Sequence, residues 1–255
     1  MTTVTAPKAF ATRAWVQQIM GMPVSVHVRA TDPHRPEIAY AVAQIFTQLR
    51  HVDSVFSTWT IDSEVLRLRD GRLEAADADP LVAEVGALCQ AATDVTGGLF
   101  TDELLGPTGT RGWDPTGLVK GWAVGRAADY LRETDRVGFS INAGGDIVCG
   151  LGQSSSALAA PWRIGIQDPQ RPETIASVVE ITDGALATSS AAARGGHIID
   201  PRTGESVLRR ASTTVIGPEL LWADVWATAT FVDTSALTDR PEWAAYTLMT
   251  TGSVA

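Results

Sequence analysis

The spacing of apolar residues along the chain predicts a mixture of strands and amphipathic helices. Apolar and polar residues alternate in residues 24–28, and a second β-like run precedes Met20-Gly21, so we expect a hairpin over residues 14–29. In residues 36–56 the apolar positions recur every three or four residues, which predicts a helix that packs on a sheet. A hairpin and a packed helix therefore open the chain.

Capping residues and turn residues mark the next elements. Asp62-Ser63-Glu64 is typical of the start of a short helix, which we expect to end at Arg69. Asp79-Pro80 begins another helix, which ends near Thr96 because Gly97-Gly98 follows. Residues 106–117 are rich in Gly, Pro and Thr and predict a loop, and a helical pattern resumes over residues 118–131.

The second half of the chain alternates between strand-like and helical patterns without a regular βαβ repeat. Such an order predicts an α+β fold. A last apolar helix is expected over about residues 219–232, and residues 243–250 form a closing element. There is no internal repeat or break in composition, so residues 13–255 are expected to form a single domain after a flexible N-terminus of residues 1–12. Strands are expected at residues 138–142, 146–149, 162–166, 177–181 and 213–216.

The composition of the chain narrows the classes of molecule that it could bind. The chain has 255 residues, 29 of them acidic and 20 basic, a formal net charge of −9. No basic stripe is present to meet a phosphate backbone, so nucleic acid is not expected as a partner. An acidic protein that binds an anionic small molecule must supply local positive charge, from a metal, a lone basic side chain or backbone N–H groups.

The cysteines and the distribution of apolar residues indicate the cellular compartment of the protein. Cys89 and Cys149 lie far apart and in no CxxC arrangement, so neither a disulfide framework nor a zinc site is indicated. The N-terminus lacks the apolar segment of a secretory signal, and no stretch reaches the apolar length of a membrane span. We therefore expect a soluble cytoplasmic protein.

The last helix carries a candidate metal site. Asp224 is the sole ionisable residue in residues 220–232, and Thr228 lies one turn later on the same face. Mg²⁺ is commonly held by one or two carboxylates together with phosphate oxygens of a substrate. The alternative is that Asp224 pairs with an Arg or a backbone N–H group and that Thr228 bonds back to a carbonyl.

Two further segments could contact an anion. Lys120 is expected in the first turn of a helix, where it opposes the helix dipole, so a phosphate is a plausible partner; a solvated Lys stem over apolar surface is the alternative. In Asn142-Ala-Gly-Gly-Asp146, Gly144 and Gly145 allow a backbone turn whose N–H groups could cradle an anion. An ordinary turn or bulge is the alternative.

His197 precedes a Pro/Gly turn in His197-Ile-Ile-Asp-Pro-Arg-Thr-Gly204. An imidazole has an unperturbed pKa close to neutral, so His197 is a candidate general base. The alternative is a histidine that merely satisfies one hydrogen bond.

Taken together and in this order, these segments resemble the ApbE family of FAD:protein FMN transferases, and the resemblance covers nearly the whole chain. The family fold is α+β and similar to tandem T-fold-like halves, with a mixed, largely antiparallel sheet, packed helices and an FAD cleft. The most specific matches are Lys120-Gly-Trp-Ala123, Asn142 to Asp146, His197 to Pro201, and Ala223-Asp224 to Thr228.

The resemblance implies a role for each matching residue. His197 would deprotonate the acceptor hydroxyl, and Asp224, Thr228 and the backbone carbonyl of Ala123 would bind Mg²⁺. Lys120 and Ile198 would contact FAD. Met20 and Trp59 would line the flavin side, and Leu99, Phe100 and Thr101 the adenylate half. Gly144 and Gly145 complete the expected cofactor-binding set.

The resemblance implies Mg²⁺-dependent transfer of the FMN moiety of FAD to a Ser or Thr of an acceptor protein, with release of AMP. An FAD pyrophosphatase and a non-catalytic FAD-binding protein are the alternatives. The sequence departs from the family pattern at Met22, where Thr is usual, and at Ser190-Ala191-Ala192, where Gly-Asp-Tyr is usual. Acceptor recognition is the property that the second departure affects.

Overall fold

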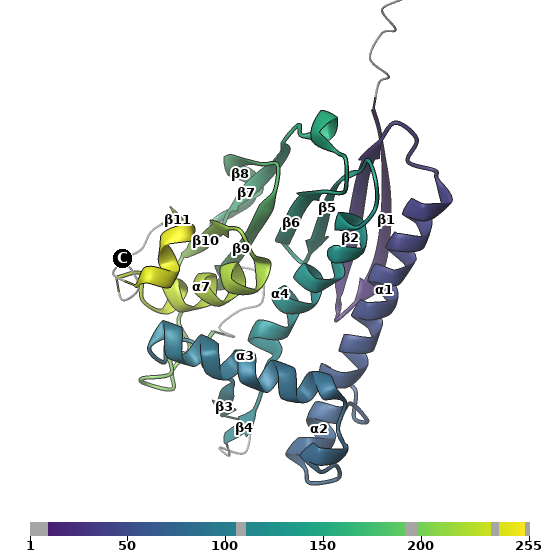
Figure 1. Ribbon diagram of the computed structural model, residues 1–255. Helices are drawn as coiled ribbons and strands as arrows, with labels where there is room; N and C mark the ends of the chain where they lie inside the picture. The colour runs from purple at the N-terminus through teal and green to yellow at the C-terminus, as the bar shows by residue number, and fades with distance from the viewer. Residues whose placement is uncertain (1–9, 106–110, 192–197, 236–239, 253–255) are drawn as a thin grey trace, which may run out of the picture.

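The computed structural model describes residues 10–105, 111–191, 198–235 and 240–252. Its centre is a seven-stranded sheet in which every neighbouring pair is antiparallel (Figure 1). The strand order across the sheet is β1-β2-β5-β6-β9-β10-β11. These strands are β1 (Ala11–Ile19), β2 (Met22–Ala30), β5 (Gly138–Ala143), β6 (Asp146–Leu151), β9 (Gly184–Ser190), β10 (Ala211–Gly217) and β11 (Thr247–Gly252).

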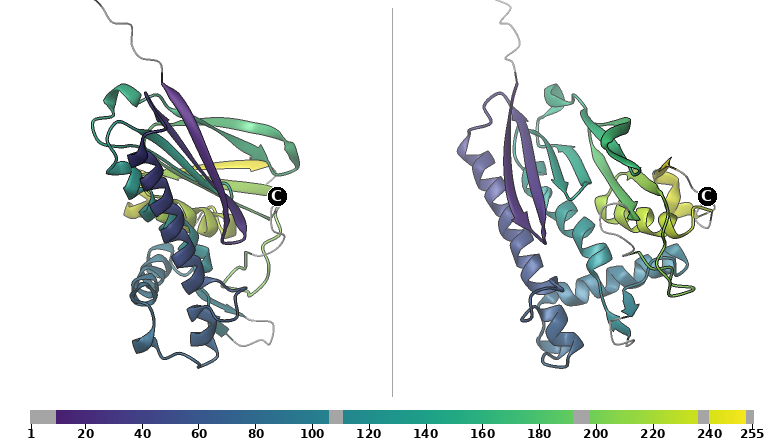
Figure 2. Two further views of the ribbon diagram at one scale, coloured as in Figure 1. Left: turned by 90° about the vertical axis from the view of Figure 1, so that its right-hand side faces the viewer. Right: turned by 180° about the vertical axis from the view of Figure 1, so that it is seen from behind.

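Three long helices lie on one face of this sheet: α1 (Pro36–Phe56), α4 (Thr116–Ala127) and α7 (Leu220–Val232) (Figures 1 and 2). A fourth, α3 (Pro80–Thr96), packs against α7. The short ones are α2 (Glu64–Arg69) and α5 (Asp129–Arg132), with 3-10 turns at Ala75–Asp77, Ser156–Leu158 and Pro241–Ala245. Two small hairpins stand apart from the main sheet: β3 (Glu103–Leu105) with β4 (Arg111–Trp113), and β7 (Trp162–Asp168) with β8 (Arg171–Ile181).

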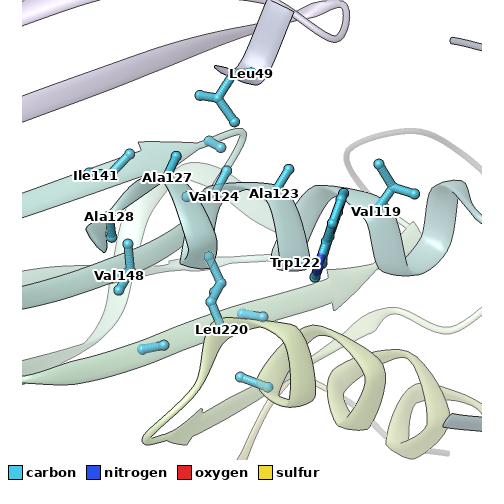
Figure 3. Packing of buried hydrophobic residues seen from close by; sticks show 14 of the residues in the cluster. Leu49, Val119, Trp122, Ala123, Val124, Ala127, Ala128, Ile141, Val148 and Leu220 are labelled. Atoms are coloured by element: carbon cyan, nitrogen blue, oxygen red, sulfur yellow. The ribbon is translucent and has the colours of Figure 1, made fainter. Parts of the chain in front are cut away.

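Helix α4 lies at the centre of the core. Its buried side chains lie between Leu49 of α1, Leu220 of α7, and Ile141 and Val148 of the sheet (Figure 3). Fully burying one such aliphatic side chain stabilises a fold by roughly 1.5–3 kcal/mol. The position of α4 relative to α7 is therefore fixed by packing, and this matters for the site below.

Local signals in the sequence explain where several elements begin and end. The Ser63 side chain accepts a hydrogen bond from the Leu66 N–H group, and that of Asp79 accepts one from Leu81. Helix α3 ends at Gly97, whose φ of +63° is the left-handed conformation that favours glycine. The expected hairpin, the helices over residues 36–56, 64–69, 80–96 and 219–232, and the α+β class are confirmed.

The structure differs from the sequence-based expectation at several elements, among them β1, which begins at Ala11 within the expected flexible N-terminus. Residues 111–113, expected as loop, form β4, and the helix expected over residues 118–131 begins at Thr116 and breaks at Ala128. Strand β9 was not expected, although it lies between β6 and β10. Its sequence, GALATSS, consists mostly of small residues with weak strand preference, and its burial by α7 decides its conformation. The single-domain boundaries stay a prediction.

Within the described residues, none of the helices combines the length and the apolar character that crossing a bilayer requires.

Candidate functional site

A cavity of about 620 Å³ opens between α4, α7, the β5–β6 turn and the β7–β8 hairpin. Segments distant in the sequence meet here because the sheet order places β6 beside β9, and α7 packs on both β9 and β10. The residues expected from the sequence that line this cavity are Leu99, Phe100, Thr101, Lys120, Gly144, Gly145, Ile198, Asp224 and Thr228.

The cavity contains a three-residue charge cluster. The Lys120 ammonium lies 3.0 Å from Asp224 Oδ2 and also contacts Asp146 Oδ2. The side chains of Lys120, Asp146 and Asp224 are 19%, 3% and 9% exposed, so all three are largely withdrawn from water. The interpretation of Lys120 as a solvated surface lysine is therefore wrong. The residue also lies in the second turn of α4, not the first, because the helix begins at Thr116.

Asp146 contacts both the charge cluster and the neighbouring strand β9. Backbone pairing between β6 and β9 ends at Ile147 and Leu186. Beyond that point, the Thr188 N–H group donates to Asp146 Oδ1 at 3.0 Å. One carboxylate oxygen therefore extends the contact between the strands, while the other meets Lys120. Asp146 belongs to the glycine motif of the sequence, but the motif alone does not indicate that its carboxylate meets Lys120.

Asp224 and Thr228 share one face of α7, as their spacing predicts, and both line the cavity. The partner of Asp224 is Lys120 and not an Arg or a backbone N–H group. Thr228 Oγ1 lies 3.4 Å from the Ser189 hydroxyl of β9. Both oxygen-bearing side chains therefore face the cavity from the same side of the helix, and Thr228 also contacts β9.

The two glycines form the turn between β5 and β6. Gly144 and Gly145 have φ values of +62° and +101°, and the flanking Ala143 and Asp146 are paired, which is the geometry of a two-residue hairpin turn. The Gly145 N–H group donates to Asn142 Oδ1 at 2.9 Å. The segment is therefore a tight hairpin turn that forms part of the cavity wall, and contact of its N–H groups with an anion stays a prediction.

The apolar end of the cavity is positioned by the end of α3. The Phe100 N–H group donates to the Thr96 hydroxyl at 3.0 Å, and that hydroxyl donates to the Ala92 carbonyl at 2.7 Å. Leu99 and Phe100 are buried against the core, so the cavity meets them as a fixed apolar surface.

Acidic groups predominate among the charged side chains of the wall. The described lining residues include four carboxylates and one basic side chain, Lys120. Asp114 is paired with Arg69 at 3.0 Å. The Gln170 N–H group and the Arg171 guanidinium hold the pKa of Asp168 below its usual value, so this carboxylate is anionic at neutral pH. The four carboxylates are Asp114, Asp146, Asp168 and Asp224.

The donor set fits a divalent cation of the magnesium type. Asp224 and Thr228 offer hard oxygens one turn apart on α7, and both line the cavity. In the part of the chain that the structure describes, no three His, Cys, Asp or Glu side chains cluster as an all-protein metal cage. Mg²⁺ suits such a site, because it keeps several waters and binds through one or two carboxylates together with phosphates.

Three expected residues do not line this cavity. Met20 occupies the β1–β2 turn with a φ of +55°, and its N–H group donates to Asp53 Oδ2. Trp59 is 94% exposed. Ala123 is fully buried, on the side of α4 that faces Leu49 (Figure 3). His197 lies outside the described residues.

Sequence reasoning missed one wall of the cavity altogether. Residues 164–169 and Pro172 of the β7–β8 hairpin face the predicted residues across the cavity. Ile164 and Ile166 alternate with exposed residues, which indicates a strand, but no pattern in the sequence shows which element the hairpin faces. Thr188, Ser189 and Ser190 of β9 also line the cavity.

Comparison with known proteins gives a consistent result. The model of the ApbE family matches residues 102–246. A Vibrio cholerae protein named FAD:protein FMN transferase is 33% identical over 130 residues, which are 47% of this chain and 38% of that protein. The match thus spans less than two-fifths of that relative's length.

Solved structures resemble the fold over most of its length. The ApbE protein of Thermotoga maritima has a TM-score of 0.71 and 22% identity, and the match covers 90% of this chain and 88% of the other. The apo form of the Pseudomonas stutzeri flavinyl transferase ApbE also has a TM-score of 0.71, with 20% identity and 95% of each chain covered. At this identity the likeness shows a shared fold.

Proposed function

The chain belongs to the ApbE family, and from this membership we propose that it transfers the FMN moiety of FAD to a Ser or Thr hydroxyl of an acceptor protein and releases AMP. One observation carries the proposal: Lys120, Asp146 and Asp224 form a buried charge cluster beside Thr228, in a cavity whose other described charges are carboxylates. The similar Vibrio cholerae protein bears the name of this activity.

The charges of the cavity explain why a cation belongs to the proposal. A dinucleotide with a diphosphate bridge is an anion, and carboxylates on the wall repel it. Lys120 supplies one positive charge, and it is already shared by two carboxylates. Asp224 and Thr228 would hold Mg²⁺, which when bound neutralises the diphosphate and polarises the bond that breaks. The family resemblance adds the backbone carbonyl of Ala123 as a ligand, although the side chain of this residue faces Leu49 and does not line the cavity.

The proposed reaction balances as a phosphoryl-type transfer. The acceptor oxygen forms a bond to the phosphorus of the FMN half, and the bond from that phosphorus to the bridging oxygen breaks, so AMP leaves with the bridging oxygen and its electron pair. His197 takes the proton of the acceptor hydroxyl. Lys120 contacts a phosphate oxygen and stabilises negative charge on it as the bridge breaks.

The remaining expected residues position the two ends of FAD. Leu99, Phe100 and Thr101 lie at the apolar end of the cavity and are assigned to the adenylate half. Ile198 also lines the cavity, and we assign it a contact with the cofactor. Gly144 and Gly145 allow close approach because neither carries a side chain. Met20 and Trp59 are assigned to the flavin side, as the family resemblance implies.

Mass spectrometry of candidate acceptor proteins tests the proposal. After incubation with the enzyme, FAD and Mg²⁺, an acceptor gains the mass of FMN at a Ser or Thr. Stoichiometric free FMN and AMP with no modified protein would instead identify an FAD pyrophosphatase. FAD that stays intact for hours would identify a binding protein.

A further inference from the structure

Asp146 is a buried carboxylate for which the proposed function assigns no task. It is 3% exposed, and its two oxygens contact different partners. The Thr188 N–H group on β9 fixes Oδ1, and Oδ2 meets the Lys120 ammonium. A backbone donor on a neighbouring strand leaves this side chain little freedom, so whatever Asp146 binds through Oδ2 is held at a defined place.

The lysine has two carboxylate partners of different kinds. Asp224 projects from α7 beside Thr228, where the cation site is proposed, whereas Asp146 projects from the sheet. One ammonium between two carboxylates leaves one negative charge in surplus. A divalent cation at Asp224 would convert that surplus to a net charge of plus one, which is the sign that a diphosphate needs.

This geometry raises a difficulty that Asp146 resolves. A cation held by Asp224 would compete with Lys120 for this carboxylate and would repel the ammonium. A lysine with no other partner would then move out of the cavity toward water. Because Asp146 is tied to β9, it offers the ammonium a partner that the cation does not use.

We propose that Asp146 is a positioning residue that keeps Lys120 beside Asp224 when a divalent cation binds, so that ammonium and cation together contact the diphosphate of FAD. The inference rests on the proposed function, since it concerns the same cavity and the same substrate. Asp146 itself touches neither FAD nor the cation and acts through Lys120.

A double-mutant cycle on FAD affinity tests whether Asp146 acts through Lys120. FAD binding is measured by flavin fluorescence at saturating Mg²⁺ without acceptor, for wild type, Asp146→Asn, Lys120→Met and the double variant. Asparagine keeps an oxygen for the Thr188 N–H group and removes the charge. We expect each single change to weaken FAD binding about tenfold, and the double variant to bind no more weakly than Lys120→Met alone.

The control variant is Asp183→Asn, which makes the same chemical change at an exposed turn position between β8 and β9 and outside the cavity wall. It should bind FAD as wild type does. Thermal melts guard against a folding artefact: Asp146→Asn keeps the Lys120–Asp224 pair and should melt close to the wild type, whereas the double variant leaves Asp224 as an unpaired carboxylate and should melt below Asp146→Asn.

Each outcome is decisive. Losses in FAD affinity that multiply in the double variant would overturn the inference, because Asp146 would then act independently of Lys120, as a direct ligand or through the fold. Unchanged FAD affinity in Asp146→Asn would overturn it as well. If the wild-type protein itself fails to bind FAD, the proposed function fails, and this result is distinct from both of the others.

Discussion

Gly121 of α4 lies directly against Asp224 of α7. A Cβ atom on Gly121 would lie 2.9 Å from Asp224 Cβ and 3.0 Å from Asp224 Oδ2, and 3.0 Å from the Leu220 carbonyl oxygen. Contacts this short require something to move, and one of the neighbours is backbone. The absence of a side chain at Gly121 is therefore what lets α4 approach α7 closely enough for Lys120 to reach Asp224.

Gly121→Ala should displace the Asp224 carboxylate and weaken the cation site more than it weakens the fold. We expect a loss of about 1–3 kcal/mol in the free energy of unfolding from overpacking, with a sharp rise in the Mg²⁺ concentration that supports activity. The control is Gly125→Ala in the same helix, where the added Cβ meets Leu220 Cβ at an ordinary 3.8 Å. Gly125→Ala should be neutral or stabilising, because alanine has a higher helix propensity than glycine. Equal behaviour of the two variants would contradict the close-packing argument.

Asp224→Asn should abolish turnover while leaving the fold largely intact. The amide keeps the size of the side chain but loses the charge that a divalent cation requires. The measurement is a thermal melt with and without Mg²⁺ and FAD, alongside the activity assay. Ligand at a hundred times its dissociation constant stabilises a protein by roughly 2.7 kcal/mol, and Asp224→Asn should lose most of the Mg²⁺-dependent part. Wild-type activity in this variant would remove the metal hypothesis.

Lys120→Met should destabilise the protein in metal-free buffer. Without the ammonium, two largely buried carboxylates face each other, and breaking a buried pair typically costs about 3–5 kcal/mol. Mg²⁺ should restore more stability to Lys120→Met than it adds to the wild type, because the cation then neutralises both carboxylates. Denaturant titrations with and without Mg²⁺ measure this difference. An equal Mg²⁺ effect in both proteins would show that the lysine and the cation do not share a site.

Cys89 and Cys149 should resist alkylation in the native protein. Both thiols are fully buried, and burial raises the pKa of Cys149 to about 11 and that of Cys89 further still. At pH 8 the thiolate fraction of Cys149 is therefore on the order of one in a thousand. Iodoacetamide at pH 8, followed by mass spectrometry, should modify neither residue until denaturant is added. Rapid labelling of the native protein would show that burial does not hold these thiols in the protonated form.

Much of the fold follows from local sequence signals. The elements that do not follow from them depend on tertiary contacts. The helix over residues 36–56 and the one ending before Gly97 are set by periodicity and capping, so their bounds are predictable. Strand β9 is not, because its small residues become a strand through contact with α7, β6 and β10. The break at Ala128 likewise has no sequence signal that we recognise.

The candidate site, too, is only partly predictable from the sequence. The Asp224 and Thr228 pair is readable from the sequence because both residues lie on one helix at a fixed spacing. The contact of Lys120 with Asp146 and Asp224 is not, because it joins α4, β6 and α7 through tertiary packing. The wall provided by the β7–β8 hairpin depends on the placement of a separate two-stranded sheet, which local patterns do not determine.

The most direct test of flavin transfer is the ratio of AMP released to flavin bound covalently. Purified enzyme, FAD and Mg²⁺ are incubated with a soluble protein extract as the source of acceptors, with Asp224→Asn enzyme as the parallel control. Nucleotides are quantified by chromatography, and protein-bound flavin by its fluorescence after denaturation. The account predicts equal amounts of AMP and protein-bound flavin, no accumulation of free FMN, and neither product with Asp224→Asn. AMP matched by free FMN, or FAD that survives intact, would contradict it.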